Sequence, residues 1–327
     1  MSALPVAVVG AGAMGTHHAR TLAELPHADL RAIVDVDIER AELLAERFDC
    51  CAYPSVKTLL FGEPHLAAAT VAVPTPLHHD LAARLLEAGK HVLVEKPIAS
   101  TVAEAEELVA LAREHGLVLA AGHVERFNPA VRALKTRLEA HALGDVLSLL
   151  ARRVGLMPPR VHDANVILDL AIHDVDVFRY LLGAGEPDDV FCNAGKAVNG
   201  DLFDYADVFL RFGKVGCLLQ ANWMTPVKIR SLSATGTRGY AELEYVRQEL
   251  DVYPAAHPVA AQSFAQLTRY SEVEPERIAV EHAEPLRLEL DGFVRAAAGG
   301  PGEIVSGVEA TASLAVVETI VGAVERV

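Results

Sequence analysis

A glycine-rich turn near the N-terminus constrains the fold of this chain more than any other feature of the sequence. Gly10, Gly12 and Gly15 form a G-x-G-x-x-G motif between an apolar segment, residues 6–9, and a helical pattern, residues 14–24. In this position the first glycine allows a tight turn, the second lets a ligand's phosphates approach the backbone, and the third lets the helix pack closely on the strand. The N–H groups and the positive helix end favour an anion. We therefore expect a strand–turn–helix unit that binds a dinucleotide.

Strand and helix patterns then alternate through the first third of the chain. Short apolar runs, typical of strands buried on both faces of a parallel sheet, cover residues 6–9, 30–34, 68–73, 91–94 and 117–121. Between them, apolar side chains recur at helical intervals in residues 14–24, 38–48, 79–88 and 102–115. Such alternation predicts right-handed crossovers and a doubly wound parallel sheet. We therefore expect an α/β domain over residues 1–122.

The pattern changes after residue 122. Longer, partly alternating runs predict the strands of a large, mainly antiparallel sheet at residues 146–154, 190–197, 206–212, 215–222, 229–235 and 241–245. Helices are expected at residues 128–143, 165–182, 285–298 and 308–327. These elements predict a second domain of α+β architecture over residues 123–327, which would bind the substrate and mediate oligomerisation.

Charge and cysteine content narrow the function classes. The chain has 327 residues, with 29 Lys and Arg against 44 Asp and Glu and a formal net charge of −15. A protein that binds nucleic-acid backbones needs a basic surface, so we expect no nucleic-acid partner. The four cysteines lack C-x-x-C spacing and the N-terminus lacks the pattern of a secretory signal, which favours the cytoplasm. No apolar run approaches the roughly 20 residues of a membrane-spanning helix, so no membrane segment is expected.

An aspartate follows the second predicted strand. Asp35 lies at the end of that strand, about 20 residues beyond the glycine motif, where a carboxylate can hydrogen-bond the 2′-hydroxyl of a ribose and would repel a 2′-phosphate. The sequence therefore favours NAD over NADP. Two alternatives stay open: Asp35 only caps the following helix, as Asp37 could equally, or Arg40 pairs with the extra phosphate of NADP.

Two further predicted strands run into segments that carry candidate site residues. One continues into Pro74, Thr75 and His78, and the next into Glu95 and Lys96. The carboxyl ends of parallel strands meet at the sheet edge where α/β proteins bind ligands. A lysine there can donate to a substrate oxygen and stabilise developing negative charge, so we expect Lys96 beside the nicotinamide. The alternative is an ordinary surface lysine.

In the second half, Asp169 and His173 lie four residues apart on a predicted helix and therefore share one face, with Asp176 three residues further. A carboxylate can orient and polarise an imidazole, which then accepts a proton from an alcohol as hydride leaves its carbon. Two other interpretations stay open. One is a structural histidine, and the other is a zinc site, for which no third and fourth ligands are evident.

The glycine motif, Glu95-Lys96-Pro97 and Asp169-x-x-x-His173, in this order, resemble the Gfo/Idh/MocA family of sugar oxidoreductases. The match covers most of the chain. The resemblance implies a Rossmann domain followed by a sheet domain, with Lys96, Asp169 and His173 at the family's catalytic positions and a cis peptide bond before Pro97. The predicted cofactor-binding set is Gly10, Gly12, Ala13, Met14, Gly15, Asp35, Pro74, Thr75, His78, Glu95, Lys96 and Arg126.

Finer similarities, in residues 122–129, 152–155 and 222–230, resemble the branch of this family that oxidises the 3-hydroxyl of UDP-N-acetylglucosamine to a ketone. Basic side chains would hold the diphosphate through charge-assisted hydrogen bonds, and Trp223 would pack on a sugar or base. The predicted substrate-binding set is Lys96, Asn128, Arg153, Asp169, His173, Lys228 and Arg230, with Arg160 as a further candidate. The alternative is that basic residues alternating on a strand form its solvated face.

One segment departs from the family pattern. Family members often have a glycine-rich approach to the Asp/His helix, whereas residues 162–168 of this chain read His-Asp-Ala-Asn-Val-Ile-Leu. This departure weakens the transfer of substrate identity from other branches, so an inositol or free-aldose dehydrogenase or reductase stays open.

The combined hypothesis is an NAD-dependent oxidoreductase acting on a small sugar or nucleotide sugar. His173, assisted by Asp169, would accept the hydroxyl proton while Lys96 stabilises the oxygen. A rival from another class is a non-catalytic dinucleotide-binding sensor, because a dinucleotide-binding fold alone does not establish chemistry. An apolar outer face of the predicted sheet would associate with the same face of a second copy of the chain, which favours a homodimer or homotetramer.

Overall fold

The computed structural model describes residues 3–157, 165–198, 200–255 and 274–324. The chain divides into two compact units, the first comprising Met1–Phe127 and Ala283–Glu318 and the second Asn128–His282 and Thr319–Val327. The first domain was predicted to end at residue 122, which is too early, and the predicted assignment of every later residue to the second domain is wrong for Ala283–Glu318.

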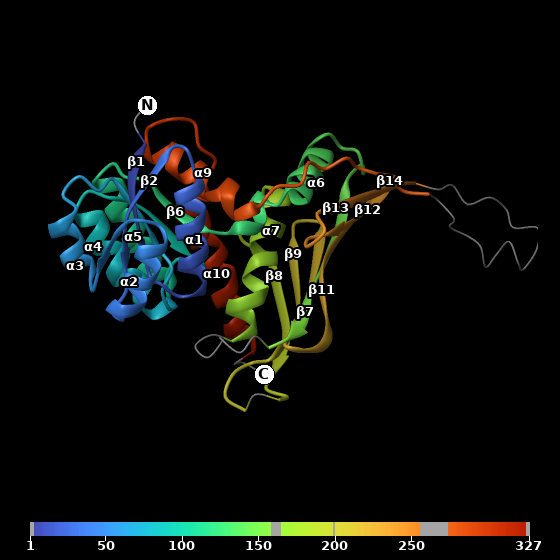
Figure 1. Cartoon of the computed structure of the whole chain (residues 1–327). Helices are drawn as coiled ribbons and strands as arrows, with labels where there is room; N and C mark the ends of the chain where they lie inside the picture. The colour runs from blue at the N-terminus through green and yellow to red at the C-terminus, as the bar shows by residue number, and fades with distance from the viewer. Residues whose placement is uncertain (1–2, 158–164, 199, 256–273, 325–327) are drawn as a thin grey trace, which may run out of the picture. The chain divides into compact units, whose positions relative to one another are not determined.

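A parallel six-stranded sheet forms the centre of the first unit. Its strand order is β3-β2-β1-β4-β5-β6, the order of doubly wound dinucleotide-binding folds, and helices cover both faces (Figure 1). The central strands are continuous apolar runs because both faces are covered, and Val6, Val8 and Val71 are fully buried. The strands are β1 (Leu4–Val9), β2 (Ala28–Val34), β3 (Cys51–Tyr53), β4 (Ala68–Val71), β5 (His91–Glu95) and β6 (Leu119–Gly122).

One helix of this unit, residues 102–114, shows how polar caps and glycines set helix ends. Thr101 accepts a hydrogen bond from the backbone N–H of Glu104, whose side chain bonds back to Thr101, and this capping box starts α5. Gly116, with a φ of 64°, follows the end of α5. The helices are α1 (Ala13–Glu24), α2 (Ile38–Arg47), α3 (Val56–Gly62), α4 (His78–Glu87) and α5 (Val102–Glu114), with short 3-10 turns η1 (Thr75–Leu77) and η2 (Val124–Phe127). The predicted helices are confirmed, whereas β3 and α3 were not among the predicted elements.

Helix α9 (Pro285–Ala297) packs into the first unit although it follows the second unit's strands in the sequence. Its Leu290 and Phe293 are fully buried in the same core cluster as Val8 of β1 and Leu22 of α1. Burial of large apolar side chains against the parallel sheet is the physical reason why this C-terminal segment belongs to the first unit.

The second unit is built on an eight-stranded sheet with the order β14-β13-β12-β11-β7-β10-β9-β8. Neighbouring strands are antiparallel apart from β7 and β10, which pair in parallel, so the predicted large, mainly antiparallel sheet is confirmed. The strands are β7 (Val146–Leu156), β8 (Asp189–Gly195), β9 (Tyr205–Phe212), β10 (Val215–Asn222), β11 (Met224–Gly236), β12 (Gly239–Glu244), β13 (Glu249–Pro254) and β14 (Glu276–Arg277). The last two were not predicted.

The two faces of the eight-stranded sheet have different surroundings. Helices α6 (Pro129–Glu139) and α7 (Ile172–Leu182) pack on one face, and a π-helical turn, η3 (Ile167–Ala171), leads into α7 (Figure 1). Along β7, Leu149 and Ala151 are buried whereas Leu150 between them is 42% exposed. This alternation is expected of an antiparallel sheet that is covered on one face only.

The last helix, α10 (Gly307–Val324), is long and apolar enough to cross a membrane by length and composition. Its Leu314, Val316 and Val317 are almost completely buried within the protein. Its Glu318 accepts a hydrogen bond from the backbone N–H of Val102. We therefore assign α10 to the protein core.

Candidate active site

The glycine turn at the start of α1 has the geometry that phosphate binding requires. Gly10 adopts a φ of 105°, and a Cβ there would collide with the carbonyl oxygen of Ala72, while a Cβ at Gly15 would collide with the carbonyl oxygen of Gly10. A Cβ at Gly12 would meet nothing within 4 Å. The fold itself therefore requires the first and third glycines, whereas the second leaves open space beside the N–H groups of the helix start, where a pyrophosphate fits. Ala13 is exposed and Met14 half-buried at this edge.

Asp35 lies beside this turn at the end of β2. Its Oδ2 accepts a hydrogen bond from the backbone N–H of Ala11 at 2.8 Å, and its Oδ1 accepts one from the N–H of Asp37 at 2.9 Å. Asp37 is the residue that caps α2, by accepting from the N–H of Arg40. The capping alternative for Asp35 is thus wrong. The carboxylate braces the glycine turn and stays half-exposed at the ribose end of the predicted cofactor site.

Glu95 was predicted to bind the cofactor, but both of its carboxylate oxygens are engaged inside the first unit. Oε1 lies 2.9 Å from Nε2 of His18, and Oε2 accepts the backbone N–H of Lys96 at 3.2 Å. Burial alone would raise the pKa of the Glu95 carboxyl, but the hydrogen bond and charge of His18, together with the charge and backbone N–H of Lys96, bring the pKa below its usual value. We therefore infer that Glu95 stabilises the end of β5, directly before Lys96.

His78 also holds this segment. Its side chain is buried, with Nδ1 2.7 Å from the carbonyl oxygen of Pro97 and Nε2 2.8 Å from that of Val73. His78 therefore connects the chain after β4 with the chain after β5. Its predicted contact with the cofactor stays a prediction. The peptide bond between Lys96 and Pro97 is cis, as the resemblance implies. Pro74 and Thr75 lie in the same connection, exposed and half-buried respectively.

Arg126 is buried at the end of the first unit's main segment. Its Nη1 lies 2.5 Å from Oε1 of Glu309, and Oε2 of Glu309 accepts hydrogen bonds from the backbone N–H and hydroxyl of Ser306. Burial would raise the pKa of Glu309, but the charge and hydrogen bond of Arg126 and the bonds from Ser306 lower it. A contact between Arg126 and the cofactor, as predicted, would therefore compete with the ion pair between Arg126 and Glu309.

In the second unit, Asp169 and His173 lie on either side of the junction between η3 and α7 and are both half-buried. The predicted helix is confirmed, but its start is a π-helical turn. Four residues are close to one full turn in either geometry, so both side chains stay near one face of the helix. π-Helical turns are rare and are frequent at functional sites.

Arg153 was predicted to bind substrate, and in the structure it lies in a buried ion pair of the second unit. The residue is 4% exposed, and its Nε and Nη2 donate to Asp174 at 2.6 and 3.1 Å. Tyr245 donates its hydroxyl to the same carboxylate, and its ring lies under the guanidinium at 4.8 Å. A buried, bidentate ion pair of this kind joins β7 to α7 and leaves the guanidinium committed within the protein.

Asn128 and Trp223 have structural positions as well. Asn128, 2% exposed, caps α6 by accepting from the N–H of Ala130 and donates to the carbonyl oxygen of Tyr245. Its predicted substrate contact stays a prediction. Trp223 is 5% exposed and therefore packs in the core rather than offering its ring to a sugar.

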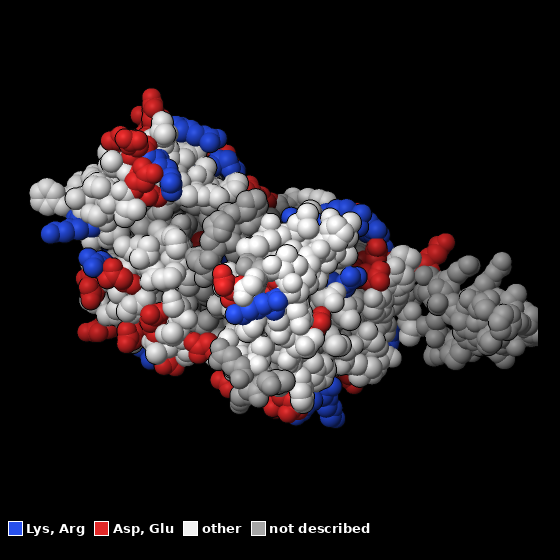
Figure 2. All heavy atoms as spheres, turned by 90° about the horizontal axis from the view of Figure 1, so that it is seen from below, with Lys and Arg blue, Asp and Glu red and all other residues white. Residues whose placement is uncertain are grey.

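Two predicted basic residues remain near the surface of the second unit. Lys228 is exposed on β11, and Arg230 on the same strand is half-buried, with Nη1 donating to the carbonyl oxygens of Val154 and Ile229. Arg160 and residues 162–164 lie outside the described residues. Figure 2 shows acidic and basic side chains interspersed, with no continuous basic field over the described residues of the face in view.

The sequence reasoning missed His18, Asp174 and Glu309, the partners of three predicted residues. A signal existed for His18, because it occupies the apolar stripe of α1 together with Gly15, Ala19 and Leu22, all buried. An ionisable residue on such a stripe needs a buried partner. No local sequence pattern marks Asp174 or Glu309 as the partner of a predicted site residue.

Comparisons with known proteins agree with both units. Residues 4–123 match the Gfo/Idh/MocA model described as "Oxidoreductase family, NAD-binding Rossmann fold", and residues 131–242 match the Gfo/Idh/MocA C-terminal domain. UDP-N-acetylglucosamine 3-dehydrogenase of Acidithiobacillus ferrooxidans is 33% identical over 247 residues, which is 75% of this chain and 75% of that protein. A solved structure of UDP-N-acetylglucosamine 3-dehydrogenase from the same organism matches with a TM-score of 0.87 and 29% identity, covering 100% of this chain and 99% of that chain.

Two further relatives differ in the substrate or pathway that their names give. The crystal structure of GenD2 from gentamicin A biosynthesis, in complex with NAD, matches with a TM-score of 0.82 and 25% identity, covering 99% and 95% of the two chains. Inositol 2-dehydrogenase of Acidothermus cellulolyticus is 35% identical over 180 residues, 54% of this chain and only 52% of that protein. The Rossmann unit, the sheet unit and these similarities together establish that the chain belongs to the Gfo/Idh/MocA family and is a nicotinamide-dependent oxidoreductase acting on CH–OH groups.

Proposed function

We propose that this chain uses NAD to oxidise the 3-hydroxyl of UDP-N-acetylglucosamine or a related nucleotide sugar. The observation that carries the proposal is the similarity to UDP-N-acetylglucosamine 3-dehydrogenase, which extends over the whole chain in structure and three quarters of it in sequence.

The proposed mechanism assigns one role to each reactive side chain. A bound nicotinamide supplies the acceptor for the hydride. His173, oriented by Asp169, accepts the proton of the reacting hydroxyl, and Lys96 donates to the same oxygen and stabilises its negative charge. The glycine turn binds the pyrophosphate through backbone N–H groups. In the reverse direction the same groups return the proton, so the mechanism does not set the physiological direction.

Position and charge at the end of β2 support NAD over NADP. Asp35 presents a carboxylate next to the glycine turn, and this negative charge would repel a 2′-phosphate. Arg40, the residue that could favour NADP, lies with its Nη2 3.3 Å from Asp37. This pair partly neutralises the positive charge that a 2′-phosphate would need.

The diphosphate of a nucleotide sugar needs cationic partners. With Arg153 committed to Asp174, we propose Lys228 and Arg230 on β11 for this role, because both remain at the surface of the second unit. The second candidate function is inositol oxidation, which the similarity to inositol 2-dehydrogenase favours. An inositol carries no diphosphate. The two functions therefore differ in whether substrate binding needs the positive charges of Lys228 and Arg230.

Steady-state kinetics with a substrate panel tests the proposal. Reduction of NAD or NADP is followed by absorbance with UDP-N-acetylglucosamine, UDP-glucose, myo-inositol and free glucose. We expect the largest kcat/KM with UDP-N-acetylglucosamine and NAD, and reduction of the product with borodeuteride should place deuterium at C3 of the sugar. A larger kcat/KM with myo-inositol would establish the second candidate instead. Lys228→Met should raise KM for the nucleotide sugar and leave KM for NAD unchanged.

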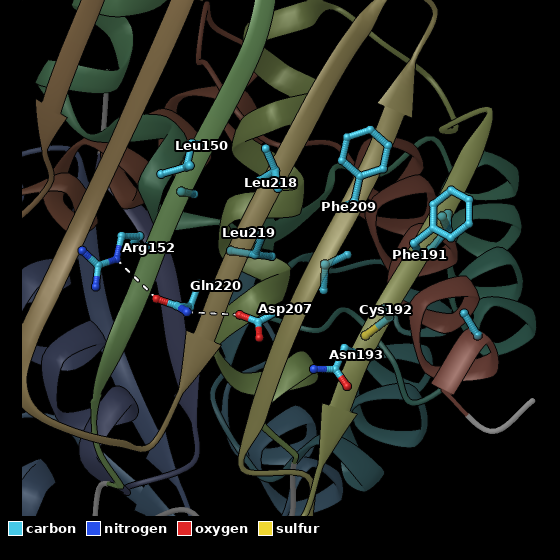
Figure 3. A pocket seen from close by; sticks show the side chains of 14 residues that line it. Leu150, Arg152, Phe191, Cys192, Asn193, Asp207, Phe209, Leu218, Leu219 and Gln220 are labelled. Atoms are coloured by element: carbon cyan, nitrogen blue, oxygen red, sulfur yellow. Dashed lines mark hydrogen bonds between the residues drawn. The ribbon is translucent and has the colours of Figure 1, made fainter. Parts of the chain in front are cut away.

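We also propose that the chain forms a homodimer or homotetramer through the outer face of its eight-stranded sheet. Phe191, Leu218 and Leu150 on this face are 64%, 45% and 42% exposed. They border a shallow cavity of about 670 Å³, beside which Arg152, Gln220 and Asp207 form a hydrogen-bonded row (Figure 3). Contiguous exposed apolar surface with a polar rim is typical of an interface between proteins.

The cytoplasm remains the proposed location. All four cysteines are free thiols. Burial raises the pKa of Cys192 to about 11 and that of Cys217 to about 12, so both thiols stay protonated and neither acts as a nucleophile. Titration of the unfolded protein with a thiol reagent, without prior reduction, should find all four thiols, whereas a shortfall would indicate a disulfide and an oxidising compartment.

A further inference from the structure

Helix α1 carries a buried histidine whose presence the glycine turn does not explain. His18 has no exposed surface and faces the core on the same stripe as Ala19 and Leu22. The core would accept an aliphatic side chain at such a position, and burying a polar ring is costly unless it is hydrogen-bonded. His18 therefore requires a hydrogen-bond partner within the core.

That partner is Glu95, at the end of β5. Nε2 of His18 lies 2.9 Å from Oε1 of Glu95, whose side chain is 12% exposed. The second oxygen, Oε2, accepts the backbone N–H of Lys96 at 3.2 Å. The carboxylate also packs against Gly122 of β6, where a Cβ would lie only 3.0 Å from Cδ and Oε2. The carboxylate is thus held by contacts with three residues.

We propose that His18 is a positioning residue for Lys96 and acts through the Glu95 carboxylate. This inference rests on the proposed role of Lys96 in hydride transfer. His18 orients the carboxylate, the carboxylate holds the N–H of Lys96, and this bond fixes the direction in which the lysine leaves the strand. Because His18 is on the helix that begins at the glycine turn, one element carries both the phosphate-binding site and the support for the lysine.

The contact uses one nitrogen of the ring only. Nδ1 of His18 is buried and has no hydrogen-bond partner among the described residues. A single N–H donor at the position of Nε2 is therefore sufficient. The amide nitrogen of glutamine reaches this position, whereas that of asparagine reaches only the position of Nδ1. His18→Gln and His18→Asn are thus polar substitutions that differ in one respect, the reach of the donor.

The first measurement does not depend on turnover. Amide hydrogen exchange at Lys96, followed by mass spectrometry of peptides that include it, reports directly on the bond from its N–H to Glu95. We expect exchange to be about tenfold faster or more in His18→Asn and close to wild type in His18→Gln. The matched control is His17→Asn, because His17 is exposed on the same helix and should leave the Lys96 amide unchanged.

The second measurement separates positioning from cofactor binding. His18→Asn should lower kcat by roughly 10²-fold, the scale of a reacting group displaced by about 1 Å, while KM for NAD changes by less than about threefold. His18→Gln should recover most of kcat. Gly122→Ala, whose Cβ would displace the same carboxylate, should reproduce the effect of His18→Asn on both exchange and kcat.

The outcomes distinguish this inference from the proposed function. Equal Lys96 exchange in His18→Asn, His18→Gln and wild type overturns the positioning role, whatever the substrate is. Faster exchange in His18→Asn with unchanged kcat also overturns it, because the lysine would then not need this support. If wild type turns over no sugar or inositol, the proposed function fails, and the exchange measurement still decides whether His18 supports Lys96. If His18→Asn does not fold, Gly122→Ala gives the decision, because unchanged exchange at Lys96 with the Glu95 carboxylate displaced overturns the positioning role.

Discussion

Adjacent histidines in this chain have opposite surroundings, which shows how little residue type alone determines a role. His17 is exposed while His18 is fully buried. In α4, His78 joins two loops through both ring nitrogens, whereas its neighbour His79 pairs with the exposed Glu107. In each pair the position on the helix determines the surroundings of the side chain, because a step of one residue turns the side chain from the core towards solvent. Roles must therefore be assigned from contacts.

Lys96→Met is the most direct test of the proposed chemistry. Methionine keeps the length and apolar stem of the side chain but removes the ammonium, which in the proposed mechanism stabilises charge on the substrate oxygen. We expect kcat to fall by roughly 10²–10³-fold while Kd for NADH, measured by fluorescence titration, stays within about twofold. The control is Lys57→Met, an exposed lysine on α3. Near-normal turnover of Lys96→Met would remove Lys96 from the mechanism.

The Arg126–Glu309 pair predicts a pH dependence of stability. The pKa of Glu309 is lowered in the folded protein, so its unfolded value, about 4.3, is the higher of the two. The carboxylate therefore contributes its full stabilisation above about pH 4.3 and loses it as pH falls through the folded-state pKa. Urea unfolding should give a larger difference between wild type and Glu309→Gln at pH 6 than at pH 3.

Glu87→Gln, an exposed position on α4, is the reference for this comparison. A difference between wild type and Glu309→Gln that is the same at both pH values would contradict the assignment. Because the Glu309 side chain is 45% exposed, salt should reduce the effect.

At the scale of elements, local patterns predicted the helices and strands with long apolar periodicity but not the short ones. β3 has three residues, Cys51–Tyr53, and α3 has seven, Val56–Gly62, too few for a period to emerge. The π-helical start of the Asp169 segment has no sequence pattern of its own. The assignment of α9 failed for another reason, because its partners lie in strands at the opposite end of the sequence.

The same distinction applies to the site. The positions of the glycine turn, Asp35 and Lys96 at strand ends could be predicted, because each follows an apolar run that the local sequence shows. The role of Arg153 could not, because it depends on Asp174, 21 residues away, and the hydroxyl that completes the cluster comes from 71 residues beyond Asp174. Short motifs can be recognised in the local sequence, whereas the buried hydrogen-bond partners of a site residue are known only from the folded structure.

Phe293→Ala tests whether α9 is part of the first unit's core. Phe293 is fully buried there, so its truncation should lower the free energy of unfolding by about 3–5 kcal/mol. Hydrogen exchange should then accelerate in β1 and α1, and the strands of the second unit should be affected less. Preferential acceleration in β9 and β10 would place α9 with the second unit. Val308→Ala, at an exposed position of α10, is the control.

At the scale of the molecule, the outer face of the eight-stranded sheet changes from apolar to charged across its width. The strand register aligns an apolar row over four strands, Phe191, Phe209, Leu218 and Leu150. The same row continues over the next strands as Ser233, Glu242 and Asp251. A sheet that only faced water would carry polar residues throughout this face, so the apolar half is the part that a second copy would cover.

Phe191→Asp tests the proposed oligomer and should dissociate it. Phe191 is the most exposed residue of the apolar row, and a carboxylate there would be buried without a partner in an interface between two copies. Light scattering coupled to size exclusion should give the monomer mass for Phe191→Asp and a dimer or tetramer mass for wild type. Phe61→Asp is the matched control, because Phe61 is 91% exposed on α3 of the other unit and should leave the mass unchanged. A monomeric wild type, or an oligomer that persists in Phe191→Asp, would mean that this face does not hold copies of the chain together.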